Sequence, residues 1–346
     1  MSPPSWLPFH VETEVQGSTL ITRPGFFRDK DRTMTQTLSA NKHGVTMRTK
    51  QGMLGAVDIP WNEDLVLDET SFRNLLGRLS TLGAHRLYVM GTAGEGYAMS
   101  DNRFRQVVDV FVDAMRDTGV GTQVGVISLA TEQVVERIGY AHGLGVRSFQ
   151  ISLPSWGAVT DTEMMTFFKT VCGEYPDSEF LHYNLGRAKR ILNGNDYRLI
   201  LDEVPNLVSA KQSTSDMSLI RSWMQQAPEM QHFMLQGAFG YASQFGECSL
   251  LCSMHGVYPE LTREYFAAGS SGDIARALQI AEELSRHRDG VFGHVNRTMI
   301  DGAYDKLLVW LTDQSFPRRL LPPYEGFTDA EAAISLDYYR RSQAGQ

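Results

Sequence analysis

Apolar and polar positions follow two alternating rhythms along most of the chain. Short apolar runs stand at residues 53–59, 85–90, 122–127, 148–153, 180–185, 207–211, 232–235 and 249–254. The stretches between them, such as 103–115 and 132–142, repeat apolar residues at the spacing of one helix face. Strands that alternate with helices form a parallel sheet, and eight such units predict a closed (β/α)8 TIM barrel. An open doubly wound sheet is the alternative, but it usually has fewer units and a glycine-rich turn after its first strand, whereas Pro60 and Trp61 follow the first run here.

The two ends of the chain do not follow this rhythm. Residues 1–48 contain several prolines and mixed charges without a sustained apolar period, which predicts a flexible N-terminal arm. Residues 263–268, 273–288 and 298–312 have helical spacing, and no further strand is predicted among them. The predicted organisation is therefore an arm over 1–48, a barrel over 49–260 and a C-terminal helical extension over 261–346.

Composition narrows the class of function. Hydrophobic residues make up 42% of the 346 residues and charged residues 21%, a globular balance. A net charge of -8 argues against nucleic acid as a partner, because phosphate binding needs clustered basic residues. No apolar run reaches the roughly 18–20 residues that cross a bilayer. The N-terminus lacks a basic start followed by an apolar core, so we predict neither a signal peptide nor membrane association.

The three cysteines are too few for a disulfide framework. Cys248 and Cys252 are four positions apart in a predicted strand, which places both on one face. They could form a metal pair, but no CxxC motif or nearby group of His and Cys completes a zinc site. We interpret these cysteines and Cys172 as buried thiols, predict no metal, and expect a cytoplasmic protein.

A glycine-rich segment follows the second predicted strand. Residues 91–96 read GTAGEG and lead into a helix that begins near Ser100. Glycines let the backbone turn tightly, and the exposed amides of Gly91, Thr92 and Ala93, with the Thr92 hydroxyl, can form a concave anion site. The dipole of the following helix adds to anion binding. The alternative interpretation is an ordinary connection between a strand and a helix, because glycine patterns alone are weak signals.

The sixth predicted strand ends in Lys211, an unusual residue for a barrel interior. Burying an ammonium group costs several kcal/mol unless the group is paired or loses its proton. Desolvation lowers the pKa of a lysine, and the neutral amine is the form that attacks a carbonyl to make an imine. The alternative is a lysine that caps the strand and points to solvent.

Three further residues at strand ends are candidates. Tyr183 faces the side of its strand opposite to His182 and Asn184, and its phenol can shuttle a proton, although a structural tyrosine is the alternative. Trp156, after the fourth strand, can form an apolar pocket wall or pack at the barrel rim. Leu251, in the eighth strand, is a candidate pocket residue whose other interpretation is core packing.

Taken together, residues 91–95, the Tyr-Asn pair at 183–184 and Lys211 resemble the dihydrodipicolinate synthase/N-acetylneuraminate lyase family of class I aldolases. The resemblance runs in order over about residues 52–292. It implies that the GTxGE loop holds the carboxylate of a 2-oxo acid and that Lys211 forms a Schiff base. It also implies a homotetramer, and no cofactor, because the imine takes the place of a Lewis acid.

Two positions differ from the common family pattern. Trp156 stands where most members have a tyrosine, and Gly186 replaces a proline after the Tyr-Asn pair, which disfavours the dipicolinate branch. The Pro-Ser-Trp of residues 154–156 and the RRLLPPY of 318–324 are similar to the benzylidenepyruvate hydratase-aldolase subgroup. That resemblance implies that Tyr183 is the acid/base residue. At two positions, Ala93 and Leu185, the chain differs from the subgroup as well.

The implied reaction begins with Lys211 attacking C2 of a 2-oxo acid whose carboxylate is held by Thr92 and Ala93. The imine then lets the C3–C4 bond break, or first lets water add at C4 of an unsaturated substrate. Tyr183 moves the proton at the C4 oxygen, Trp156 lines the pocket for an aromatic end, and the products are pyruvate and an aldehyde. The alternatives are a sugar-acid aldolase or dehydratase, a dihydrodipicolinate-synthase-like condensation, and a catalytically silent protein that binds a metabolite.

Overall fold

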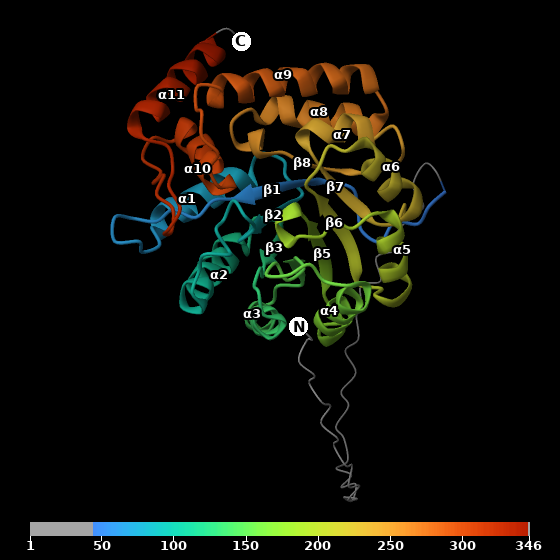
Figure 1. Cartoon of the computed structure of the whole chain (residues 1–346). Coiled ribbons are helices and arrows are strands. Elements are labelled where there is room, and N and C mark those ends of the chain that lie inside the picture. Colours follow the sequence, from blue (N-terminus) through green and yellow to red (C-terminus); the bar gives the residue numbers. More distant parts are fainter. Residues whose placement is uncertain (1–43, 345–346) are drawn as a thin grey trace, which may run out of the picture. The chain divides into compact units, whose positions relative to one another are not determined.

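The computed structural model describes residues 44–344 and contains a closed barrel of eight parallel strands (Figure 1). Each strand pairs with the next one along the chain, and the eighth pairs with the first. The predicted TIM barrel is confirmed, and the open doubly wound sheet is wrong. The strands are β1 (Met53–Val57), β2 (Arg86–Val89), β3 (Gly121–Gly125), β4 (Ser148–Ile151), β5 (Glu179–Asn184), β6 (Leu207–Gln212), β7 (Gln231–Leu235) and β8 (Ser249–Leu251).

Helices surround the strands and continue beyond the barrel. Those between strands are α1 (Glu69–Ser80), α2 (Asp101–Met115), α3 (Thr131–Gly143), α4 (Asp161–Glu174), the 3-10 turn η1 (Gly186–Ala188), α5 (Gly194–Glu203), α6 (Met217–Gln226) and α7 (Gln236–Ala242). After β8 follow the 3-10 turn η2 (Ser253–Gly256), α8 (Pro259–Ser271), α9 (Ile274–Phe292), α10 (Asp301–Thr312) and α11 (Asp329–Ala344).

Helix α2 shows how the apolar pattern becomes packing. Ser100 caps the helix by accepting a hydrogen bond from the amide of Arg103. The predicted apolar face is buried against the barrel, with Phe104, Val107 and Phe111 almost without exposed surface. The helix begins two residues before the predicted range because a polar first turn carries no apolar signal.

The eighth strand is shorter than its apolar run. The run at 249–254 predicts a strand throughout, but pairing with β1 ends at Leu251 and the chain then turns into η2. Short apolar runs do not distinguish a strand from a helical turn. Cys248 and Cys252 therefore flank the strand. Both are buried, as is Cys172, and none of the three forms a disulfide within residues 44–344. Within residues 44–344, no group of three or more potential ligands could hold a metal ion.

The C-terminal extension has one helix more than its apolar spacing predicts. Helix α11 was missed because only Ala332 and Ser335 are buried on it, too few to make a period. It packs against α9, where the Ser335 hydroxyl donates to the carbonyl of Val291 at 2.7 Å. Gly290 is required there, since an added Cβ would lie 2.1 Å from the ring of Tyr338. Helices α9, α10 and α11 lie together on one side of the molecule (Figure 1).

The predicted arm falls mostly outside the described residues, which begin at 44. Within its last residues, the side chain of Met47 is buried. The Arg48 guanidinium donates to the carbonyls of Leu201, at 2.8 Å, and Val204, at 3.1 Å, at the end of α5. None of the helices between residues 44 and 344 combines the length and apolar character that a membrane span requires.

Candidate active site

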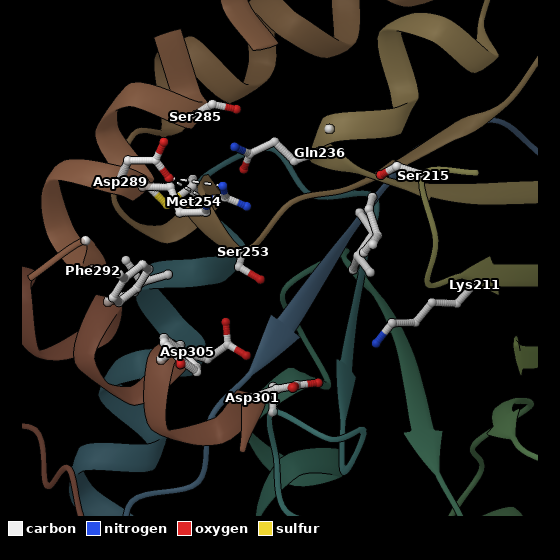
Figure 2. Close-up of a pocket in the computed structure, with 18 of the residues that line it drawn as sticks. Lys211, Ser215, Gln236, Ser253, Met254, Ser285, Asp289, Phe292, Asp301 and Asp305 are labelled. Carbon is white, nitrogen blue, oxygen red and sulfur yellow. Dashed lines mark hydrogen bonds and ion pairs between the residues drawn. The ribbon is translucent and has the colours of Figure 1, made fainter. Parts of the chain in front are cut away.

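A cavity of about 590 Å³ opens at the carboxyl ends of the barrel strands (Figure 2). Four of the predicted site residues line it, namely Ala93, Tyr183, Lys211 and Leu251. The carboxyl end of a barrel is where strand-end side chains converge, so their meeting there follows from the fold. Other lining residues come from β2, from segments that follow the strands, and from α9 and α10, and they include Tyr88, Ser215, Gln236, Ser253, Met254, Phe292, Asp301, Tyr304, Asp305 and Leu308.

Lys211 points into the barrel. Its side chain is only 4% exposed, and its Nζ donates to the hydroxyl of Tyr88 at 2.9 Å. The same Nζ lies 3.8 Å from the centre of the Tyr183 ring. The alternative of a lysine that points to solvent is therefore wrong.

The pKa of Lys211 is shifted in the direction opposite to the predicted one. Burial lowers the pKa of Lys211, but Tyr183 and Tyr88, with a contribution from Asp301, more than offset this and raise the pKa above its ordinary value. The predicted lowering is therefore wrong for the resting site, because desolvation was considered without the groups that face the amine. The resting lysine is an ammonium and must give up a proton before it attacks a carbonyl.

Tyr88 is a site residue that the sequence analysis missed. It lies in β2, and burial raises the pKa of its phenol to about 12, so the phenol is protonated at neutral pH and its oxygen accepts from Lys211. Gly91 leaves room for it, since an added Cβ at Gly91 would lie 2.5 Å from the Tyr88 ring. The only available signal was one hydroxyl in an apolar run, which is weak because tyrosine is common in cores.

The glycine-rich loop turns tightly, but for a different reason from the predicted one. The residues with positive φ are Met90, at 62°, and Glu95, at 54°, rather than the glycines. Gly94 and Gly96 instead permit close backbone approach, because an added Cβ would lie 2.7 Å from the Met90 amide nitrogen and 2.3 Å from the Met90 carbonyl oxygen, respectively. Thr92, in the same loop, is buried.

Thr92 and Tyr183 are joined at the cavity wall. The Thr92 hydroxyl donates to the Tyr183 hydroxyl at 3.3 Å. The neighbours of Tyr183 point the other way, as the alternation along β5 predicts. His182 shares a 2.8 Å hydrogen bond with the hydroxyl of Tyr197, and Asn184 donates to the carbonyl of residue 192 at 2.9 Å.

Glu95 ties the loop to the C-terminal extension. Its Oε1 accepts from Trp61 at 3.0 Å and from Nζ of Lys306 at 2.5 Å, and its Oε2 accepts from the amide of Leu321 at 2.6 Å. Tyr324 packs edge-on against Tyr97, with ring centres 5.1 Å apart. The RRLLPPY segment of residues 318–324 therefore contacts the glycine-rich loop that contains Thr92. Sequence spacing did not reveal this contact.

Helix α10 adds two carboxyl groups to the cavity wall, and neither was predicted. Asp301 forms a two-pronged ion pair with Arg187, at 2.8 and 3.0 Å. Asp305 is partly buried and faces the cavity. Burial, followed by the charge of Asp301, raises the pKa of Asp305 to about 7, although Ser253 and Lys211 act to lower it. The extension thus supplies a carboxyl group that changes its protonation near neutral pH.

Trp156 lies outside this cavity in the single chain. Its side chain is 84% exposed on the loop after β4, and its carbonyl accepts from Lys189 at 2.7 Å. Leu251 lines the cavity and also packs in the inner cluster of the barrel with Leu54 and Tyr88, so both interpretations of this residue apply.

Comparison with known proteins identifies the family of the chain and supports its fold. Residues 49–315 match the Dihydrodipicolinate synthetase family. The chain is 27% identical over 247 residues to a 4-hydroxy-tetrahydrodipicolinate synthase of Phenylobacterium zucineum (strain HLK1), covering 70% of this chain and 82% of that protein.

Solved structures with this fold carry several names. YagE from E. coli K12, solved in complex with pyruvate, superposes with a TM-score of 0.75 at 15% identity, covering 85% of this chain and 98% of that one. The N-acetylneuraminate lyase of Proteus mirabilis superposes with a TM-score of 0.74 at 16% identity, covering 85% and 98%. At these identities the likeness supports the fold alone.

Proposed function

The chain belongs to the dihydrodipicolinate synthetase family, and on that premise we propose that it is a Schiff-base lyase that cleaves a 2-oxo acid on Lys211. The observation that carries the proposal is the Lys211 amine, buried between the phenols of Tyr88 and Tyr183 and lining a cavity large enough for a small substrate. No carboxylate within residues 44–344 forms an ion pair with Lys211, and a buried lysine in that situation is costly to stability and typical of a reacting group.

The proposed reaction starts when the neutral Lys211 amine adds to C2 of the substrate and water leaves. Tyr88, in contact with Nζ, is suited to pass on the proton that the ammonium must lose. The Thr92 hydroxyl, the amides of Thr92 and Ala93 and the adjacent Gly91 are proposed to hold the carboxylate. Tyr183 is the proposed acid/base group next to the imine. The protonated imine draws electrons from the C3–C4 bond, so this route to cleavage requires no metal or cofactor.

For the aldehyde end we propose an apolar, preferably aromatic group, released after hydration and aldol cleavage. Support comes from the apolar part of the cavity wall, formed by Leu251, Met254, Phe292 and Leu308. Trp156 would join this wall only if its loop turned inward, so the proposal rests on these four residues instead.

A sugar-acid aldolase or dehydratase is the second candidate. The same cavity exposes Ser215, Gln236 and Ser253, which can hydrogen-bond to substrate hydroxyls. Polar side chains of this kind distinguish hydroxylated from apolar substrates strongly, because a buried polar group left without a hydrogen-bond partner costs about 1–3 kcal/mol. A direct comparison of the two substrate classes decides between the candidates: release of pyruvate from a benzylidenepyruvate and from a 3-deoxy-2-oxo sugar acid. At least tenfold faster release from the benzylidenepyruvate is expected.

Trapping of the imine tests the central proposal. The protein is incubated with pyruvate and borohydride, its intact mass is measured, and the modified peptide is mapped, with Lys211→Ala as the control. A reduced pyruvyl adduct on Lys211 that is absent from the control is expected. Absence of an adduct, under conditions that trap another member of the family, would contradict the lyase and favour a silent metabolite-binding protein. Assembly as a homotetramer is proposed by resemblance, and light scattering coupled to gel filtration tests it.

A further inference from the structure

Asp305 and Lys211 reach the same cavity from opposite walls. Lys211 extends from β6 of the barrel, and Asp305 extends from α10 of the C-terminal extension (Figure 2). Both side chains point into the space between them in that view. A substrate joined to Nζ of Lys211 would extend into this space, so Asp305 lies on the side of the substrate that is turned away from the imine nitrogen.

The groups around Asp305 act on the pKa of its carboxyl group in opposite directions. On its own helix, Asp301 opposes ionisation of Asp305. From the barrel side, Lys211 and a hydrogen bond with Ser253 favour the carboxylate. Asp305 in turn contributes to the raised pKa values of Tyr88, in β2, and of Asp58, which follows β1. Burial and Asp301 outweigh Ser253 and Lys211 and raise the pKa of Asp305 to about 7, so the carboxyl can both take up and release a proton at neutral pH.

A second buried carboxyl group, that of Asp58, lines a small cavity together with Asp305. Asp58 follows β1, is almost fully buried, and its Oδ1 has no hydrogen-bond partner among residues 44–344. Burial raises its pKa well above the ordinary value, and Asp305 adds to the effect while Lys306 opposes it. A small cavity of about 20 Å³ lies between Asp58 and Asp305, enough for one water molecule. Burial and Asp305 both disfavour the charged form of Asp58, because two carboxylates this close would repel each other.

The geometry places Tyr183 away from the C4 oxygen, whose proton the family resemblance assigns to this tyrosine. The Tyr183 ring lies against Nζ, on the imine side, and its hydroxyl is engaged with Thr92. The C4 oxygen of a bound substrate is three bonds beyond the imine carbon, counted through C3 and C4, and therefore extends away from Lys211. Of the three carboxyl groups that line the cavity, Asp301 is paired with Arg187 and Asp289 with Arg288, whereas no ion pair within residues 44–344 holds Asp305.

We propose that Asp305 is the acid–base residue for the C3–C4 half of the reaction, an inference that rests on the proposed Schiff-base function. The Asp305 carboxylate removes the proton of the C4 hydroxyl, the C4 oxygen forms the aldehyde carbonyl, and the C3–C4 bond breaks. Its electron pair moves to C2–C3 and neutralises the iminium as an enamine. After the aldehyde leaves, protonated Asp305 returns the proton to C3, and water releases pyruvate from Lys211. No oxidant or reductant takes part.

Exchange of the methyl protons of pyruvate in D2O tests this inference without knowledge of the aldehyde. Wild-type protein is expected to form the imine, and Asp305 is expected to move protons to and from C3. Asp305→Asn should slow the exchange, followed by NMR, by at least about 100-fold. Borohydride trapping of pyruvate on Lys211 should stay within about twofold of wild type. Asp337→Asn, which removes an exposed carboxylate on α11, is the matched control and should leave both measurements unchanged.

The pH profile distinguishes a chemical role from a structural one. The exchange rate should rise with pH through a value near 7, as the carboxylate of Asp305 forms, and Asp305→Asn should lose this rise. Ser253→Ala removes a hydrogen bond that lowers the pKa of Asp305 and should shift the rise to higher pH. This second variant also tests the proposal if Asp305→Asn does not fold. Normal trapping with exchange within about threefold of wild type in Asp305→Asn would overturn the inference, as would an unmoved profile in Ser253→Ala. Absence of an adduct in the wild-type protein would instead overturn the proposed function.

Discussion

Asp305 and Lys306 are neighbours in α10, but their side chains enter two different buried regions. Lys306 has no exposed surface and is enclosed by Glu95 and by the carbonyl of Arg319, each at 2.5 Å. Asp305 faces the cavity, where Lys211 lies on the opposite wall. The first region pairs Lys306 with a carboxylate at close range, whereas no ion pair within residues 44–344 joins Lys211 to Asp305 across the second.

The difference separates a structural charge from a reactive one. Burial lowers the pKa of Lys306, and Glu95 counters that effect through a direct ion pair. Within the part of the chain that the structure describes, Lys211 in contrast donates one hydrogen bond, to the neutral phenol of Tyr88, although an ammonium has three donors. A buried charge that is fully paired binds elements together, and one that is sparsely paired stays available for chemistry.

Replacement of Lys211 by Met should have the largest effect, and on activity alone. Exchange of pyruvate protons should fall to background, by at least about 10⁴-fold, because the imine cannot form. The free energy of unfolding should not decrease, since an apolar side chain replaces a sparsely paired ammonium. Exchange by NMR and thermal unfolding measure the two effects. A marked loss of stability would show that Lys211 is structural, which would break the comparison.

Replacement of Lys306 by Met should lower stability, in contrast to the replacement of Lys211. It leaves the Glu95 carboxylate buried without its cation, which should lower the free energy of unfolding by about 3–5 kcal/mol. Denaturant unfolding measures the change, and Lys169→Met, at an exposed site on α4, is the control. Stability equal to wild type would mean that the Glu95 pair does not hold the extension to the barrel.

The stability of Asp305→Asn should depend on pH. Burial raises the pKa of Asp305 from 3.8 to about 7, so its favourable contribution to folding is complete below pH 4 and is lost as pH rises towards 7. An asparagine does not ionise and avoids that loss. Allowing for water in the cavity, the variant should be more stable than wild type by roughly 1–2 kcal/mol at pH 8, with no such gain at pH 4. Thermal unfolding at both pH values tests this, and a gain independent of pH would contradict it.

The smallest expected effect is that of Tyr88→Phe. Without the hydroxyl, Lys211 loses its hydrogen-bond partner and its path for proton release, so imine formation should slow by about tenfold, or roughly 1.4 kcal/mol. The rate at which the borohydride-trapped adduct accumulates measures this. Tyr140→Phe, which removes a hydroxyl bonded to Asp109 on an exposed surface, is the control. If Tyr88→Phe and Tyr140→Phe slowed imine formation equally, Tyr88 would have no specific role in the reaction.

Much of the barrel side of the site was predictable. Apolar spacing indicated eight strands, and their carboxyl ends indicated where Lys211, Tyr183 and Ala93 would meet. Trp156 was expected in the same pocket but lies on an exposed loop, because loop direction does not follow strand periodicity. Tyr88 was hidden in an apolar run, where a tyrosine looks like any other core residue.

The sequence by itself determined the strand order and which side chains point inward, because those properties follow from local periodicity and from the closure of eight similar units. Only the tertiary structure decided what Asp305 and Lys306 do. No local pattern distinguishes two adjacent charged residues of one helix, since their roles depend on Glu95 and Lys211, which lie far away along the chain. The protonation of Lys211 was likewise decided in three dimensions, because a pKa responds to burial and to every charge and dipole nearby.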